Sequence, residues 1–137
     1  MRILAVDFGD VHTGVSISDP TGFLASNSMT INSRNMQEVA RQVLALAHEN
    51  GCEELVVGYP RNMNGTVGER AKKCEDFAHL LEAGGAYKVI LWDERLTSVD
   101  ANRILSDAGK KRKKQKQLVD AVAASLILQN YLDSRRS

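Results

Sequence analysis

The sequence has only two cysteines and no apolar stretch long enough to cross a bilayer. Cys52 and Cys74 form no C-x-x-C pair, so the sequence favours buried, reduced thiols over a disulfide framework or a cysteine metal site. The N-terminal segment MRILAVDFGD has a short apolar run that Asp7 interrupts, and no small-residue cleavage site, which argues against a signal peptide. Together these absences predict a cytoplasmic protein that makes no membrane contact.

Internal repeats and linker-like segments are absent as well. The chain has 137 residues, about the size of one typical domain, so it can bury a core of its own. Its hydrophobic content of 43% and its charged content of 26% are ordinary for a globular protein. We therefore expect residues 1–137 to form one domain, as a monomer or a homodimer.

The hydrophobic pattern predicts three strands followed by helices and strands in alternation. Strands are predicted at residues 2–7, 14–18, 23–31, 55–57 and 89–92. Helices are predicted over residues 36–49, 70–83, 97–109 and 118–132. The first three strands would form an antiparallel meander, and the strand–helix–strand crossovers would add two parallel strands. The expected fold class is therefore α/β, a mixed sheet with helices on both faces.

Three acidic residues lie where a buried strand ends or where a helix packs, and a carboxylate at such a position costs free energy. Asp7 ends the first strand, Glu94 follows the last strand, and Asp120 begins the last predicted helix. Functional groups gather at the carboxyl ends of parallel strands, so we expect the three acids at one edge of the sheet. Grouped carboxylates repel one another unless a cation neutralises them, and one or two Mg²⁺ or Mn²⁺ ions suit such oxygen ligands. Two such ions can clamp the attacking and leaving oxygens of a phosphodiester, so the pattern indicates metal-dependent hydrolysis.

Each acid also has a purely structural explanation. Asp7 fits a cap of the turn that follows it. Glu94 fits a surface ion pair with Arg95 or Lys88. Asp120 fits an acid in the first turn of a helix. The basic run directly before Asp120 favours a shared site over three separate structural roles.

A dense basic run precedes Asp120 on a chain whose net charge is only +1, so the rest of the molecule is mildly acidic. Such a run is the electrostatic footprint of a polyanionic partner such as nucleic acid. Because it lies between two predicted helices, we expect a loop that delivers charge next to Asp120. A solvated connector without any binding role is the alternative. The six bases are Lys110, Lys111, Arg112, Lys113, Lys114 and Lys116.

Four sequence blocks, in this order, are typical of one protein family. They are VDFG at 6–9 with Gly14-Val15, VGYPRNMNGT at 57–66, DERLTS at 93–98 and VDAVAASLILQ at 119–129. The DERLTS block after a strand is specific in combination with the others, whereas D-x-G alone is a weak signal. On these blocks the chain, from Arg2 to about Leu132, resembles the YqgF/RuvX family of RNase H-like nucleases. That family is related in fold to Holliday-junction resolvases of the RuvC kind.

The resemblance implies an RNase H-like fold and a carboxylate site at Asp7, Glu94 and Asp120. It also implies a role in maturing the 5′ end of pre-16S ribosomal RNA, with resolvase activity on branched DNA as an alternative. The family often has a basic residue in the first turn, where this chain has Asp10-Val11-His12. For Asp10 a turn cap is favoured over a place in the metal site.

Arg61 and Arg95 lie beside strand ends and are the candidates for phosphate contacts, although Arg95 also fits a role in orienting Glu94. Two other function classes share parts of this pattern. A sugar kinase or chaperone-type ATPase also begins its phosphate loop with D-x-G, but it needs two such domains to enclose ATP. A non-catalytic nucleic-acid-binding module would use the basic run and leave the acids structural. The sequence favours the nuclease.

Overall fold

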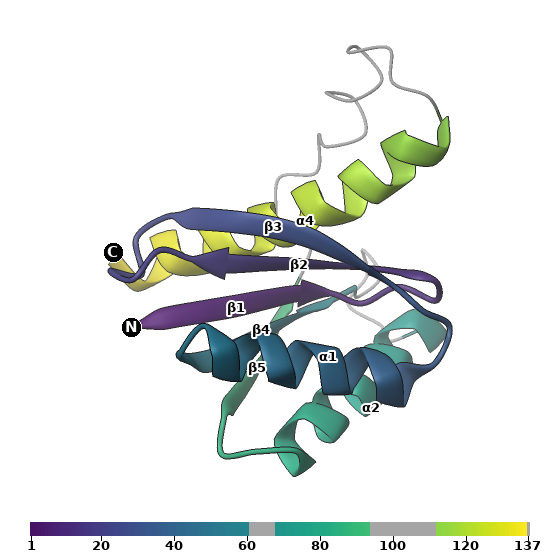
Figure 1. Ribbon diagram of the computed structural model, residues 1–137, viewed down its shortest axis with the longest axis horizontal. Coiled ribbons are helices and arrows are strands. Elements are labelled where there is room, and N and C mark those ends of the chain that lie inside the picture. The colour runs from purple at the N-terminus through teal and green to yellow at the C-terminus, as the bar shows by residue number, and fades with distance from the viewer. Residues whose placement is uncertain (61–67, 94–111, 137) are drawn as a thin grey trace.

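The structure is a computed structural model, and it describes residues 1–60, 68–93 and 112–136 (Figure 1). Within the last range the side chains are described from Ala121 to Arg135. In the described parts of the chain, no helix is long and apolar enough to span a membrane.

The centre of the fold is a five-stranded mixed sheet. Its strands are β1 (Arg2–Asp7), β2 (His12–Ser18), β3 (Ala25–Asn32), β4 (Cys52–Tyr59) and β5 (Lys88–Asp93). The strand order is β3-β2-β1-β4-β5, with β2 antiparallel to both β1 and β3, and with β4 parallel to both β1 and β5. The predicted meander and the two added parallel strands are confirmed.

Helices cover both faces of the sheet, as predicted (Figure 1). Helices α1 (Met36–Glu49) and α2 (Glu69–Ala83) pack on one face, and α4 (Arg112–Arg136) packs on the other. Side chains alternate between the faces along β1, so Leu4 and Val6 join the core under α1 and α2, whereas Ile3 and Ala5 join the core under α4. All four side chains are almost completely buried.

Local signals explain where α1 begins and ends. The side-chain oxygen of Asn35 accepts a hydrogen bond of 3.0 Å from the backbone N–H of Glu38, which satisfies one of the free donors of the first turn. After the last turn Gly51 adopts a φ of +65°, a left-handed conformation that glycine takes without a steric penalty. The predicted helix boundaries therefore hold.

Two strands differ from their predicted lengths. The third strand begins at Ala25, not at Phe23, because one carboxylate oxygen of Asp19 accepts the N–H groups of Phe23 and Leu24 and holds them in a turn. Strand β4 extends over eight residues, and the buried Glu54 is part of it.

The last helix begins earlier than the sequence analysis predicted. Its first residue is Arg112, so Arg112–Lys116 is helical and the loop predicted for the basic run is wrong over that range. Lys and Arg are good helix formers even where no apolar periodicity marks the segment. Lys110 and Lys111, together with the helix predicted over 97–109, lie outside the described residues.

Candidate active site

Three parallel strands end at the same edge of the sheet. Strand β1 ends at Asp7, β4 at Tyr59 and β5 at Asp93, and Tyr59 pairs with Asp93 in the register. The antiparallel strands meet this edge too, since β2 begins at His12 and β3 ends at Asn32. There Nδ1 of His12 lies 2.6 Å from the side-chain oxygen of Asn32. The carboxyl edge of the sheet is therefore rich in polar side chains.

Asp7 lies at this edge on the face that α4 covers. It follows Ile3 and Ala5 at alternate positions of β1, and those two side chains pack under α4. Its neighbours Val6 and Phe8 are buried on the opposite face, where the Phe8 ring stacks on Phe77 with centroids 4.6 Å apart. The backbone around Asp7 is therefore held in place by the packing of the residues before and after it in sequence.

The turn after Asp7 is built around Gly9. The buried hydroxyl of Thr13 accepts a hydrogen bond of 3.2 Å from the Gly9 N–H. A Cβ atom at position 9 would lie 2.0 Å from the carbonyl oxygen of His12, far inside van der Waals contact. Only glycine fits this turn without moving the backbone next to Asp7.

Asp10, in the same turn, pairs with helix α2. Its carboxylate lies 3.1 Å from Nζ of Lys73 and 3.6 Å from Nη1 of Arg70. The hydrogen bond from Lys73, assisted by the nearby positive charges of Arg70 and Arg34, lowers the pKa of Asp10 below its ordinary value. The turn cap that the sequence favoured for Asp10 is thus replaced by an ion pair with α2.

The other predicted site residues are placed only in part. Glu94, Arg61 and Arg95 lie outside the described residues, although β5 ends at the residue just before Glu94. Asp120 lies in the ninth position of α4, about the third turn. It does not begin the helix, because the basic segment before it is already helical.

Helix α4 is tied to the sheet by side chains of its C-terminal half. The side chain of Gln129 accepts a hydrogen bond of 3.0 Å from the N–H of Ala25, and the Tyr131 hydroxyl donates one of 2.6 Å to Glu54. Ala25 and Glu54 both lie near the edge of the sheet opposite to Asp7. The helix therefore runs antiparallel to β1, with its C-terminal end beside the amino end of that strand (Figure 1).

Sequence reasoning missed Arg70 and Lys73 as residues of this edge. Arg70 shares the helical spacing of the buried Cys74, Phe77 and Leu81. A charged side chain on an otherwise apolar helix face is the signal that could have found it.

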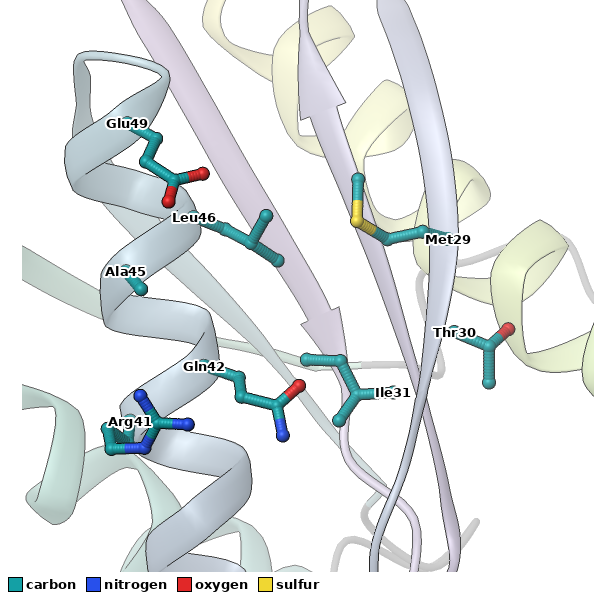
Figure 2. A pocket seen from close by; sticks show the side chains of 8 residues that line it. All are labelled: Met29, Thr30, Ile31, Arg41, Gln42, Ala45, Leu46 and Glu49. Atoms are coloured by element: carbon teal, nitrogen blue, oxygen red, sulfur yellow. The ribbon is translucent and has the colours of Figure 1, made fainter.

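A groove of about 420 Å³ lies elsewhere, between β3 and α1 (Figure 2). Met29, Ile31 and Leu46 form its apolar wall, and Arg41 and Glu49 lie on its helical side. Its one carboxylate, Glu49, gives no cluster of acids. Among the described residues no group of three His, Cys, Asp or Glu side chains is placed to hold a metal ion, and Glu94 and the Asp120 side chain lie beyond that set.

A sequence model of the family described as "RuvX: Holliday junction resolvase" matches residues 1–134. The chain belongs to the RuvX family. It is 45% identical to a protein of Acetivibrio thermocellus and 41% identical to one of Lachnospira eligens, both named "Putative pre-16S rRNA nuclease". The first match covers 98% of this chain and 97% of the relative, and the second covers 99% of each.

Solved structures of resolvases share the fold. RuvC of Thermus thermophilus in complex with a Holliday junction substrate superposes with a TM-score of 0.64 at 13% identity, covering 100% of this chain and 98% of RuvC. The Fowlpox virus resolvase bound to Holliday junction DNA gives a TM-score of 0.59 at 14% identity and covers all of both chains. The predicted RuvX family, the RNase H-like α/β fold and the hydrolytic nuclease class are confirmed.

Proposed function

We propose that this RuvX-family nuclease is a divalent-metal-dependent endonuclease whose ligands are Asp7, Glu94 and Asp120, and that it trims the 5′ end of precursor 16S rRNA. The observation that carries the proposal is the position of Asp7. Its side chain ends β1 on the face covered by α4, at the same sheet edge where β5 ends one residue before Glu94.

The direction of α4 supports Asp120 as the third ligand. Tyr131 contacts Glu54, and Glu54 is in register with Ile3 of β1. From Ile3 the strand advances about 13 Å to Asp7, at about 3.3 Å per residue. From Tyr131 the helix advances about 16 Å in the same direction to position 120, at about 1.5 Å per residue. Asp7 and position 120 thus lie at comparable distances from the Ile3–Glu54–Tyr131 level, and both reach the carboxyl edge of the sheet.

The helical spacing gives a second argument for Asp120. Position 120 precedes the fully buried Ala124 by four residues, about one turn. Ala124, Ile127, Leu128 and Tyr131 are all buried, and this stripe of α4 packs toward the sheet. Extended by one turn, the same stripe reaches position 120.

The chemistry of the donor set suits Mg²⁺ or Mn²⁺, because carboxylate oxygens are the ligands that these ions prefer. One or two such ions would supply an activated water and stabilise the leaving oxygen. The chain's own contribution is rigidity. Asp7 is held between the buried Val6 and Phe8, and Gly9 and Thr13 fix the turn beside it.

Nucleic acid is the proposed partner, and the single domain of residues 1–137 is proposed to carry the whole activity. The names of the relatives favour precursor rRNA, which would place the protein in the cytoplasm. The basic segment Lys110–Lys116 would supply charge for the phosphate backbone, with Arg61 and Arg95 as contacts near the site.

A second candidate is the resolution of branched DNA. It is favoured by the family description and by the shared fold of a resolvase bound to a four-way junction. The two substrates present the same phosphodiester to a metal site, so the acids do not discriminate between them.

The deciding experiment is a cleavage assay with three matched substrates: a 16S rRNA fragment with its 5′ extension, an unstructured single-stranded RNA, and a four-way DNA junction. With magnesium present, we expect cleavage at the 5′ extension and none in EDTA. Cleavage of the junction alone would select the resolvase. Binding without any cleavage, in magnesium or in manganese, would select the non-catalytic module.

A further inference from the structure

Two cations of α2 lie beside the turn that follows Asp7. Nη2 of Arg70 donates a hydrogen bond of 2.5 Å to the carbonyl oxygen of Phe8, and Nζ of Lys73 donates one of 3.1 Å to Asp10. Phe8 is the residue next to Asp7 in sequence. Arg70 is therefore anchored to the backbone of the proposed active site, although it comes from a different element.

The anchor leaves part of the Arg70 guanidinium available. Nη2 is engaged by the Phe8 carbonyl, while Nη1 faces the Asp10 carboxylate at 3.6 Å, too far for a good hydrogen bond. Because a guanidinium presents several donors in a fixed fork, it can hold a carbonyl and an anion at once.

All three charged side chains are accessible to a ligand. The exposed fractions of the Asp10, Arg70 and Lys73 side chains are 59%, 46% and 50%. Two cations face one carboxylate, and Arg34 adds a third positive charge nearby. The cluster therefore keeps a positive excess even when Asp10 is paired, and an exposed ion pair of this kind is weak enough to exchange.

We propose that Arg70 and Lys73 bind a backbone phosphate of the nucleic acid next to the cleavage site, and that Asp10 occupies the place of that phosphate in the free protein. This inference rests on the proposed nuclease function and adds a phosphate site to it. The ligand chemistry is a phosphodiester anion, which RNA and DNA both supply. Asp10 acts as a competing anion that the phosphate displaces.

The proposal makes opposite predictions for the two sides of the ion pair. Asp10→Asn removes the competing charge while it keeps size and polarity, so nucleic acid should bind about two- to fivefold more tightly, the range of a weak exposed ion pair. Lys73→Gln removes one phosphate contact, so affinity should fall and the slope of log affinity against log salt should decrease by about 0.7–0.9.

Two neighbours on α2 provide matched controls. Lys72→Gln removes the same charge from an exposed position one residue away, and Asp76→Asn removes one negative charge from an exposed position on the same helix. Both controls report the general effect of net charge. We expect each to change affinity and salt slope less than its counterpart at position 73 or 10.

The experiment measures binding of the full-length protein to single-stranded RNA and to a four-way DNA junction by fluorescence anisotropy, in EDTA so that no cleavage occurs. A double-mutant cycle completes it. If Asp10 competes for Lys73, the tighter binding of Asp10→Asn should shrink when Lys73→Gln is also present. Urea unfolding of every variant checks that the fold is intact.

The outcomes separate this site from the nuclease itself. Asp10→Asn and Asp76→Asn with equal affinities, or Lys73→Gln and Lys72→Gln with equal salt slopes, would overturn the phosphate site. A response with only one of the two nucleic acids identifies which backbone is bound. If the variants show the expected binding pattern but the wild type cleaves nothing in magnesium, the nuclease function is contradicted and the phosphate site still stands.

Discussion

The hydroxyl of Tyr131 in α4 donates a hydrogen bond of 2.6 Å to one carboxylate oxygen of Glu54 in β4. Arg135 donates to the other oxygen at 2.8 Å, so the buried carboxylate is satisfied on both sides. Tyr131 also meets the Trp92 ring edge to face, with centroids 5.5 Å apart. These contacts join α4 to strands β4 and β5, and they set the direction in which α4 approaches the carboxyl edge.

Tyr131→Phe should lower the free energy of unfolding by about 1–3 kcal/mol, because it leaves a buried carboxylate oxygen without its donor. Urea denaturation measures the loss. Tyr87→Phe is the control, since the Tyr87 hydroxyl makes no hydrogen bond to the described residues, and its effect should stay within about 0.5 kcal/mol. Equal effects of the two substitutions would show that the Glu54 contact adds no stability.

The same residue predicts a pH dependence on the alkaline side. Burial and the hydrogen bond to Glu54 raise the pKa of Tyr131 to about 12, above the value of about 10 for an unfolded chain. The native state therefore keeps the proton longer, so this contribution to stability is complete below about pH 10 and decreases as the pH rises toward 12. An ultraviolet titration of the wild type should show one late tyrosine that is missing in Tyr131→Phe. If the late titration step persists in Tyr131→Phe, it does not come from Tyr131.

Gly9→Ala should disturb the turn that carries Asp7. The new Cβ would overlap the His12 carbonyl oxygen, which belongs to the backbone and cannot rotate away. We expect a loss of about 1–3 kcal/mol in stability, the usual cost of overpacking, together with slower cleavage. Gly85→Ala is the control, because its new Cβ would meet only the ring of Tyr87, a side chain that can move. Wild-type activity in Gly9→Ala would contradict a rigid turn.

Asp7→Asn should abolish cleavage and leave folding and nucleic-acid binding nearly unchanged. The amide keeps the size of the carboxylate but is a much poorer ligand for a hard cation. Cleavage rate in magnesium, urea midpoint and binding in EDTA are the three measurements. Asp76→Asn makes the same change at an exposed position of α2 and should retain activity. A normal cleavage rate in Asp7→Asn would exclude Asp7 as a ligand.

Replacing the six bases of Lys110–Lys116 by Gln should weaken binding of every nucleic acid and leave the cleavage rate of bound substrate unchanged. Glutamine is a good helix former, so the helix from Arg112 onward should persist. Each lost phosphate contact should reduce the salt slope by about 0.7–0.9. Lys88→Gln, an exposed change at the amino end of β5, is the control. An unchanged affinity and an unchanged salt slope would show that the segment is solvated and has no role in binding.

The sheet and its helices were predictable wherever burial and periodicity coincide. The apolar run of β1 and the helical spacing of α1 gave correct elements because their core faces are uninterrupted. Strand β4 was predicted too short because Glu54 reads as a polar boundary. Its partners, Tyr131 and Arg135, lie 77 and 81 residues further along the chain, and no local pattern contains them.

The site was predictable only in part. Asp7 follows from a carboxylate at the end of a buried strand, and its place at the carboxyl edge agrees with that reasoning. Arg70 and Lys73 escaped it, because their contacts with Phe8 and Asp10 span more than sixty residues and depend on how α2 docks. The role of Asp10 was misjudged for the same reason.

The two faces of the sheet become complete at different stages of synthesis. The core under α1 and α2 involves residues up to Val89, whereas Ile3, Ala5 and Val56 are covered by the final helix. While the ribosome is still making α4, the emerged strands carry a bare apolar face. This face is therefore completed only after α4 has been made, and a chain interrupted before α4 would expose a surface that favours aggregation.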